Sequence, residues 1–115
     1  MALGDLEREV MTQLWEAGEP LTVRQVHERL SRDRELAYTT VMTVLDRLAK
    51  KGVVRQERAD RAYRYAPVQS REEMTAAVMF DALSSTPDRD AALAHFVGRL
   101  SPEVLAAAIE AAGRG

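Results

Sequence analysis

The 115-residue sequence contains no cysteine, which excludes disulfide bonds and metal sites built from thiolates. Its two histidines, His27 and His95, lie far apart in the chain, and neither has a second histidine at the spacing typical of zinc ligands. No apolar run approaches the roughly 20 residues of a membrane span, and the acidic start differs from a signal peptide. We therefore expect a cytoplasmic protein without membrane insertion, metal or other cofactor.

Motifs of catalysis are also missing. The sequence has no glycine-rich phosphate loop and no nucleophile motif. The acidic pair Glu72 and Glu73 falls in the first turn of a predicted helix, where capping explains it better than acid–base chemistry does. With 46% apolar and 30% charged residues, the composition is that of an ordinary globular protein, so we predict one that is not an enzyme and has no catalytic residues.

The first half of the chain shows three segments of helical periodicity with clear boundaries. The first covers residues 5–17 and stops at Gly18, and the second opens with Thr22 and Gln25 at the spacing of a capping box. The third begins at Tyr38 and ends at Gly52, as expected for a glycine after a helix. A short turn between the second and third segments gives the order of a helix-turn-helix.

After Gly52 the period changes from helical to alternating. The runs VVRQER and AYRYAP, separated by residues 59–61, predict a β-hairpin that Pro67 closes. Three further helices follow, introduced by a capping box at Ser70 and Glu73, by Asp88, and by Ser101 with Pro102. The predicted fold is mainly α with a small β-hairpin wing, comprising a winged helix-turn-helix domain over residues 1–68 and a three-helix dimerisation region over residues 69–115.

Positive charge is concentrated in the middle of a chain whose formal net charge is -2. Between Arg47 and Arg64 there are seven basic residues against two acidic ones, whereas the part after Pro67 has four against seven. Such a segment indicates either contact with an anionic partner or a solvated, salt-bridged face, and composition alone does not separate the two.

The third predicted helix has two distinct faces when drawn at 100° per residue. Val41, Val44, Leu45 and Leu48 share one sector, whereas polar side chains share the other. Ordinary surface helices have the same pattern, but the helix-turn-helix order and the basic wing favour double-stranded DNA as the partner. The predicted DNA-binding residues are Tyr38, Thr39, Thr40, Thr43, Arg47, Lys50, Lys51, Arg58, Arg61 and Arg64.

Individual members of this set also have structural explanations. Lys50 and Lys51 complement the helix dipole as well as suiting phosphates, and Arg58 and Arg61 would serve solubility at a loop. The aromatic residues Trp15, Tyr63 and Tyr65 fit packing between elements better than stacking on single-stranded bases.

The three tail helices have few places to bury their apolar residues except against a second copy of the chain. We therefore predict a homodimer. The candidate dimerisation residues are Met74, Val78, Phe80, Leu83, Leu93, Phe96, Val97, Leu100, Leu105 and Ile109.

Three stretches together resemble the penicillinase-repressor family of bacterial winged-helix regulators, the BlaI/MecI group with its CopY relatives. They are LGDLEREVMTQLWEAGEPLTVRQVHERL, LAYTTVMTVLDRLAKKGVV and RAYRYAP, and the resemblance extends more weakly to the end of the chain. It implies a homodimer that represses transcription from an inverted-repeat operator of the TACA/TGTA type, with the third helix in the major groove. Control of β-lactam-resistance or related genes is the corresponding expectation.

The resemblance also bears on how repression ends. β-Lactam-type members are inactivated when a membrane sensor triggers cleavage of an Asn-Phe bond, and the corresponding place here is His95-Phe96, where histidine replaces asparagine. Phe96 is better explained as a residue of the dimer core, on a stripe with Leu93, Val97 and Leu100. The cysteine cluster of copper-type members is absent. A membrane sensor or protease partner is thus an implication of the family, while a winged helix that docks a protein or senses a small molecule is the alternative function.

Overall fold

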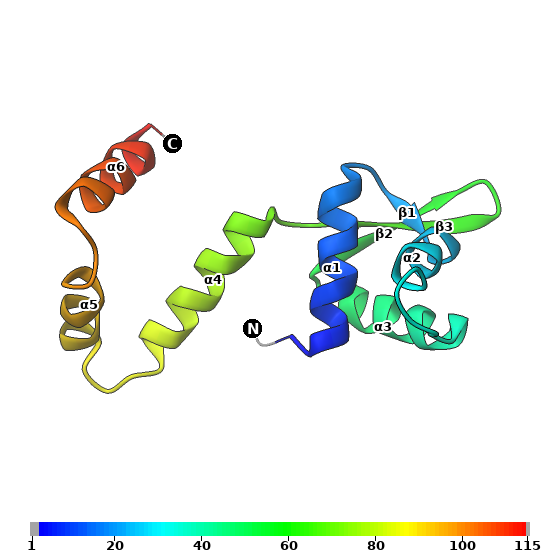
Figure 1. Cartoon of the computed structure of the whole chain (residues 1–115), viewed down its shortest axis with the longest axis horizontal. Coiled ribbons are helices and arrows are strands. Elements are labelled where there is room, and N and C mark those ends of the chain that lie inside the picture. The colour runs from blue at the N-terminus through cyan, green and yellow to red at the C-terminus, as the bar shows by residue number, and fades with distance from the viewer. Residues whose placement is uncertain (1–2, 115) are drawn as a thin grey trace. The chain divides into compact units, whose positions relative to one another are not determined.

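The computed structural model describes residues 3–114 and contains six helices and a three-stranded antiparallel sheet within that range (Figure 1). The chain divides into two compact units, one ending at Ala76 and one beginning at Ala77. Met1, Ala2 and Gly115, which the predicted domain ranges 1–68 and 69–115 include, lie outside the described residues.

The first unit contains α1 (Asp5–Ala17), α2 (Val23–Leu30) and α3 (Tyr38–Lys50). Local sequence explains their ends. Gly18 follows α1 with φ 68°, and Gly52 closes the turn after α3 with φ 77°, a region that glycine enters without a Cβ penalty. At the start of α2 the Gln25 amide donates to Thr22 Oγ1 at 3.2 Å while Gln25 Oε1 accepts from the Thr22 amide at 2.9 Å, which confirms the predicted capping box.

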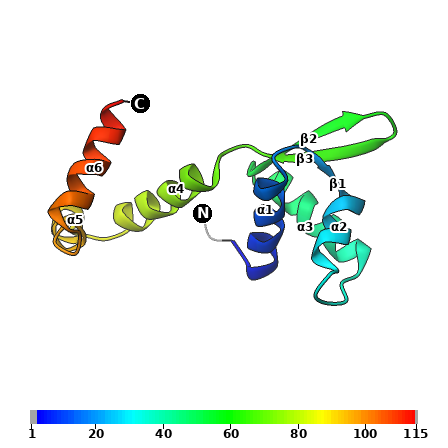
Figure 2. The ribbon, with the colours of Figure 1, turned by 45° about the horizontal axis from the view of Figure 1, so that its top comes forward.

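The sheet has the order β1-β3-β2, with β1 at Leu21–Thr22, β2 at Val54–Ala59 and β3 at Ala62–Pro67. Strands β2 and β3 form the predicted hairpin, closed by Asp60 and Arg61, and Asp60 adopts a left-handed φ of 56°. Strand β1 pairs Leu21 with Tyr65 and Thr22 with Arg64. Figures 1 and 2 show the hairpin tip outside the group of helices, as expected for a wing.

One hydrophobic core holds this unit together. It combines Val10, Met11 and Leu14 of α1 with Val26 and Leu30 of α2, the inner face of α3, and residues of the sheet. The buried residues of α3 are the four that the helical wheel predicts: Val41, Val44, Leu45 and Leu48. The winged-helix prediction for this part of the chain is therefore confirmed.

The helices of the tail are α4 (Arg71–Ser84), α5 (Arg89–Val97) and α6 (Pro102–Gly113). Asp88 Oδ1 accepts from the Ala91 amide at 3.0 Å, and Ser101 Oγ accepts from the Val104 amide at 3.1 Å, so both predicted caps form. No residue of these three helices is buried within the part of the chain that the structure describes.

Candidate nucleic-acid interface

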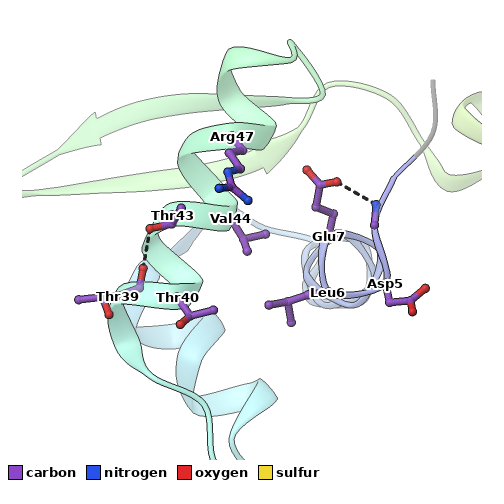
Figure 3. A pocket seen from close by; sticks show the side chains of 9 residues that line it. Asp5, Leu6, Glu7, Thr39, Thr40, Thr43, Val44 and Arg47 are labelled. Carbon is purple, nitrogen blue, oxygen red and sulfur yellow. Dashed lines mark hydrogen bonds between the residues drawn. The ribbon is translucent and has the colours of Figure 1, made fainter.

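Helix α3 separates an inner apolar face from an outer polar face. The outer face carries Thr39, Thr43, Asp46 and Lys50, all of which are exposed, with Arg47 at its side. Thr43 Oγ1 donates to the Thr39 carbonyl oxygen at 2.9 Å (Figure 3), so this hydroxyl has its proton engaged and its lone pairs open to a donor. The face is short, polar and free of bulky side chains at its centre, which suits close approach to a groove.

All ten residues predicted to bind DNA are exposed. They lie on α3, on Lys51 directly after it, and on the two strands and loop of the wing. The structure thus presents the whole predicted set to solvent, on α3 and the wing of one compact unit.

The basic residues of this set differ in whether they form salt bridges. Within residues 3–114, Arg47, Arg58, Arg61 and Arg64 form no salt bridge. Lys50 Nζ, in contrast, lies 3.1 Å from Asp46 Oδ2, and Lys51 Nζ lies 2.8 Å from Glu7 Oε2. The arginines are therefore available to phosphates or bases at once, whereas the two lysines would first have to leave their carboxylate partners.

Glu7 links the start of α1 to the end of α3. Its carboxylate accepts from Lys51 Nζ at 2.9 and 2.8 Å and from the Gly4 amide at 2.9 Å, and its side chain is only 13% exposed. The hydrogen bond from Lys51, followed by that from Gly4, lowers the pKa of Glu7 below the ordinary 4.5, with a smaller contribution from the charge of Arg47.

A surface hollow of about 520 Å³ lies between α1 and α3 beside this carboxylate (Figure 3). Asp5, Leu6 and Glu7 form one wall, and Thr39, Thr40, Thr43, Val44 and Arg47 form the other. Both carboxylates on the α1 side are ion-paired, Asp5 with Arg8 at 3.1 Å and Glu7 with Lys51 at 2.8 Å, so Arg47 is the charged lining residue without a salt bridge in the described chain.

The wing carries arginine side chains on both of its faces. The guanidinium of Arg58 lies 5.7 Å from the ring centroid of Tyr63, its partner across the strands, and Gln56 Nε2 donates to the Tyr65 hydroxyl at 2.8 Å. Since paired residues share a face and neighbours alternate, Arg64 lies on the face opposite to Arg58. The hairpin therefore carries free arginines on both faces and Arg61 at its tip.

The two tyrosines of the wing behave differently from each other. Tyr65 is buried in the core, as predicted. Tyr63 is 46% exposed and lies beneath Arg58, so the prediction that it packs between elements is wrong. The position along β3 explains the difference, because the residues that precede Tyr65 lie toward the exposed tip of the hairpin, whereas Tyr65 and Ala66 lie in the buried part of the strand.

His27 joins α2 to the start of α3. Its Nε2 lies 2.6 Å from the Leu36 carbonyl oxygen, so this nitrogen carries the proton, and its ring meets Tyr38 edge to face at 5.7 Å. These contacts hold the turn at the residue where α3 begins. The sequence predicted only that His27 does not bind zinc. In the structure His27 supports the start of α3, where the candidate interface begins.

Met42 was not among the predicted residues, yet it is 43% exposed on α3 one turn after Tyr38. An apolar side chain at the edge of such a face can contact the methyl group of thymine. The helical wheel contains the signal, since Met42 lies outside the buried sector, but its apolar character directs attention to the core.

The predicted dimerisation residues lie on α4, α5 and α6 and in the turn after α5. Five of these ten residues are exposed, including Phe80 at 62% and Ile109 at 65%, and the other five are partly buried. Met74 differs, because it packs against the core of the first unit. His95 and Phe96 are both exposed within helix α5, so a protease would have to unwind that helix to reach the bond between them.

Among residues 3–114, no group of three or more histidine, aspartate or glutamate side chains is placed to hold a metal ion. No single helix of the described chain is long and apolar enough to cross a membrane, although the bent pair of α5 and α6 meets that requirement jointly by length and composition.

The sequence is also similar to known transcriptional repressors. The family model described as penicillinase repressor matches residues 3–111. The transcriptional regulator BlaI of Mycobacterium tuberculosis, in strains CDC 1551 and H37Rv, is 62% identical over 104 residues, or 88% of this chain and 75% of the relative.

The fold is also similar to those of solved structures. The DNA-binding domain of the repressor BlaI, determined in solution, is similar with a TM-score of 0.55 and 28% identity over 62% of this chain and 85% of that domain. A MarR family protein from Bacillus stearothermophilus, 19% identical, has a TM-score of 0.55 over 99% of this chain and 73% of that protein, which shows a similarity of fold alone. The chain belongs to the penicillinase repressor family, a family of DNA-binding transcriptional regulators and not of enzymes.

Proposed function

We propose that two copies of this chain bind an inverted-repeat operator of the TACA/TGTA type and repress transcription, with the outer face of α3 in the major groove of each half-site. The observation that carries the proposal is the state of α3: its four predicted core residues are buried while its threonines and Arg47 remain exposed, and Arg47 forms no salt bridge among residues 3–114. Threonine and arginine are side chains that contact thymine methyl groups, guanine edges and phosphates.

The wing supplies the second contact. Arg58, Arg61 and Arg64 are exposed, and Arg61 lies at the two-residue loop that closes the hairpin. We assign these arginines to the DNA backbone or the minor groove next to the site of α3, because unpaired guanidinium groups bind phosphates and narrow minor grooves well.

The tail supplies the second copy. Helices α4 to α6 expose apolar side chains and bury none within the described chain, so the second unit lacks a core of its own. A C2 partner would cover this surface, and dimerisation would fix two α3 helices to two half-sites. Repression of β-lactam-resistance or related genes in the cytoplasm completes the proposal, on the basis of the family to which the chain belongs.

The test begins with selection of bound fragments from the source genome, followed by titration of full-length protein onto the selected duplex and onto a scrambled duplex of equal composition. A specific repressor should prefer the selected duplex by roughly 10³-fold or more at physiological salt. Equal affinity for both duplexes would contradict the proposal and favour an electrostatic docking role for the basic segment. An inverted repeat in the selected fragments supports the dimer, whereas single half-sites would contradict it.

A further inference from the structure

Trp15, the only tryptophan of the chain, is placed where the first unit passes into α4. Its indole Nε1 donates to the Gln69 carbonyl oxygen at 2.9 Å. The guanidinium of Arg71, the first residue of α4, lies 5.4 Å from the centroid of its ring. Trp15 of α1 therefore contacts both Gln69, in the loop before α4, and Arg71, the first residue of α4.

Three other contacts fix the same end of α4. The Glu73 amide donates to Ser70 Oγ at 3.0 Å, and the Ser70 amide donates to Glu73 Oε1 at 2.8 Å, so the helix begins at a defined residue. One turn further, Met74 packs against the core of the first unit. The segment from Gln69 to Met74 is thus attached to the first unit by a hydrogen bond and a cation–π contact from Trp15 and by apolar packing of Met74.

We infer that Trp15 is a positioning residue that sets the direction in which α4 leaves the DNA-binding unit, and thereby the spacing of half-sites that the dimer accepts. The inference rests on the proposed function for its DNA readout. Trp15 itself lies on α1 and is not among the residues assigned to DNA.

The length of α4 makes this attachment sensitive. A helix of 14 residues is about 21 Å long. Rotation of such a rod by about 10° at its base moves its far end by almost 4 Å, close to the rise of about 3.4 Å for one base pair. A loosened base would therefore let the dimer accept operators whose half-sites are a base pair closer or further apart.

The first experiment needs no DNA. Because the chain has no cysteine, spin labels can be attached at Glu28→Cys on α2 and Ser84→Cys at the end of α4, with unlabelled chain in excess so that only distances within one chain are measured. The unaltered anchor should give one narrow distance distribution. Trp15→Leu and Arg71→Ala should each broaden it, and Arg89→Ala, which removes one exposed arginine from α5, should not.

Arg71 is exposed, so its removal leaves the core intact even if Trp15→Leu impairs folding. Trp15→Phe retains a ring beneath Arg71 but no N–H donor, and should give an intermediate width. An unchanged width in Arg71→Ala and in folded Trp15→Phe would overturn the inference.

The second experiment measures spacing selectivity of the full-length protein on duplexes with two inverted TACA/TGTA half-sites, separated by distances that increase in single base pairs. An intact anchor should give roughly tenfold preference for one spacing, and Arg71→Ala should reduce it to about twofold while binding to a single half-site stays unchanged. Equal weakening on every spacing would instead show a lost phosphate contact and overturn the inference. Lack of any spacing preference in the unaltered protein would contradict the proposed dimeric operator, and the distance distributions would still decide the role of Trp15.

Discussion

Arg47 and Lys50 lie one turn apart on α3 but differ in their surroundings, since Arg47 forms no salt bridge in the described chain and Lys50 is paired with Asp46. We expect Arg47→Ala to lower the affinity for the operator by about 1–3 kcal/mol and to relax the base preference at one position, because a forked contact to a base edge is lost. Titration onto the operator and onto single-base variants of it measures both effects.

Lys50→Ala serves as the matched comparison on the same face. It should weaken operator and scrambled duplex alike and reduce the slope of log K against log salt by about one unit, as expected for one phosphate contact. If neither substitution changes affinity or base preference, the outer face of α3 is not the DNA-binding surface.

Glu7 gives a prediction about pH. Its pKa is lowered in the folded protein, chiefly by the hydrogen bond from Lys51, so its contribution to stability is fully present above the ordinary value of 4.5 and is lost as the pH falls through the lower folded pKa. Glu7→Gln should therefore reduce the free energy of unfolding at neutral pH and flatten its decline in acid. Urea unfolding between pH 7 and pH 3 measures the difference.

Glu73 titrates in the same range, because hydrogen bonds from the Ser70 amide and hydroxyl lower its pKa as well. The comparison of Glu7→Gln with the unaltered protein cancels this second contribution. Parallel pH profiles of the two proteins would show that the Glu7–Lys51 contact does not stabilise the fold.

Helix α3 packs one face against the core and presents the other to the proposed DNA partner. Leu45 is fully buried on its inner face. Leu45→Ala should lower the free energy of unfolding by about 2–5 kcal/mol through the cavity it leaves. Met42→Ala, on the same helix but half-exposed, should change stability far less, and thermal melts of both variants test this. An equal loss for the two would contradict the assigned faces.

The elements that could be predicted from sequence are those whose boundaries are local. Thr22 with Gln25, Gly18, and Ser70 with Glu73 each act within four residues, and all appear where predicted. Strand β1 was missed, because Leu21 and Thr22 become a strand only by pairing with Tyr65 and Arg64, more than 40 residues away. Two residues carry too little periodicity to reveal a strand.

The same distinction between local sequence signals and distant contacts applies to the candidate interface. Exposure of the threonines and arginines could be predicted from the helical wheel and the alternation of the wing. The partners of Lys51 and Trp15 could not, because Glu7 is 44 residues from Lys51 and Gln69 is 54 residues from Trp15. The helix dipole and the net charge of a segment say nothing about which charges are already neutralised in the folded unit.

For the whole molecule, the tail gives the clearest prediction. Phe80→Asp places a charge on a 62% exposed apolar position of α4. It should convert the dimer to a monomer at equal concentration while the first unit remains folded, because burying an unpaired carboxylate at an interface is unfavourable. Phe80→Leu, which keeps the position apolar, should remain dimeric. Sedimentation equilibrium measures the mass, and a monomeric unaltered protein at all concentrations would contradict the proposed assembly.

Helices α4 to α6 show no buried residue in the described chain, and this has a consequence for dosage. If a second copy supplies the missing core, the folded tail and the two-headed DNA binder exist only to the extent that copies meet. At low abundance the dimer population then grows with the square of the number of chains per cell. Halving expression would empty a half-occupied promoter far more completely than it would for a monomeric regulator.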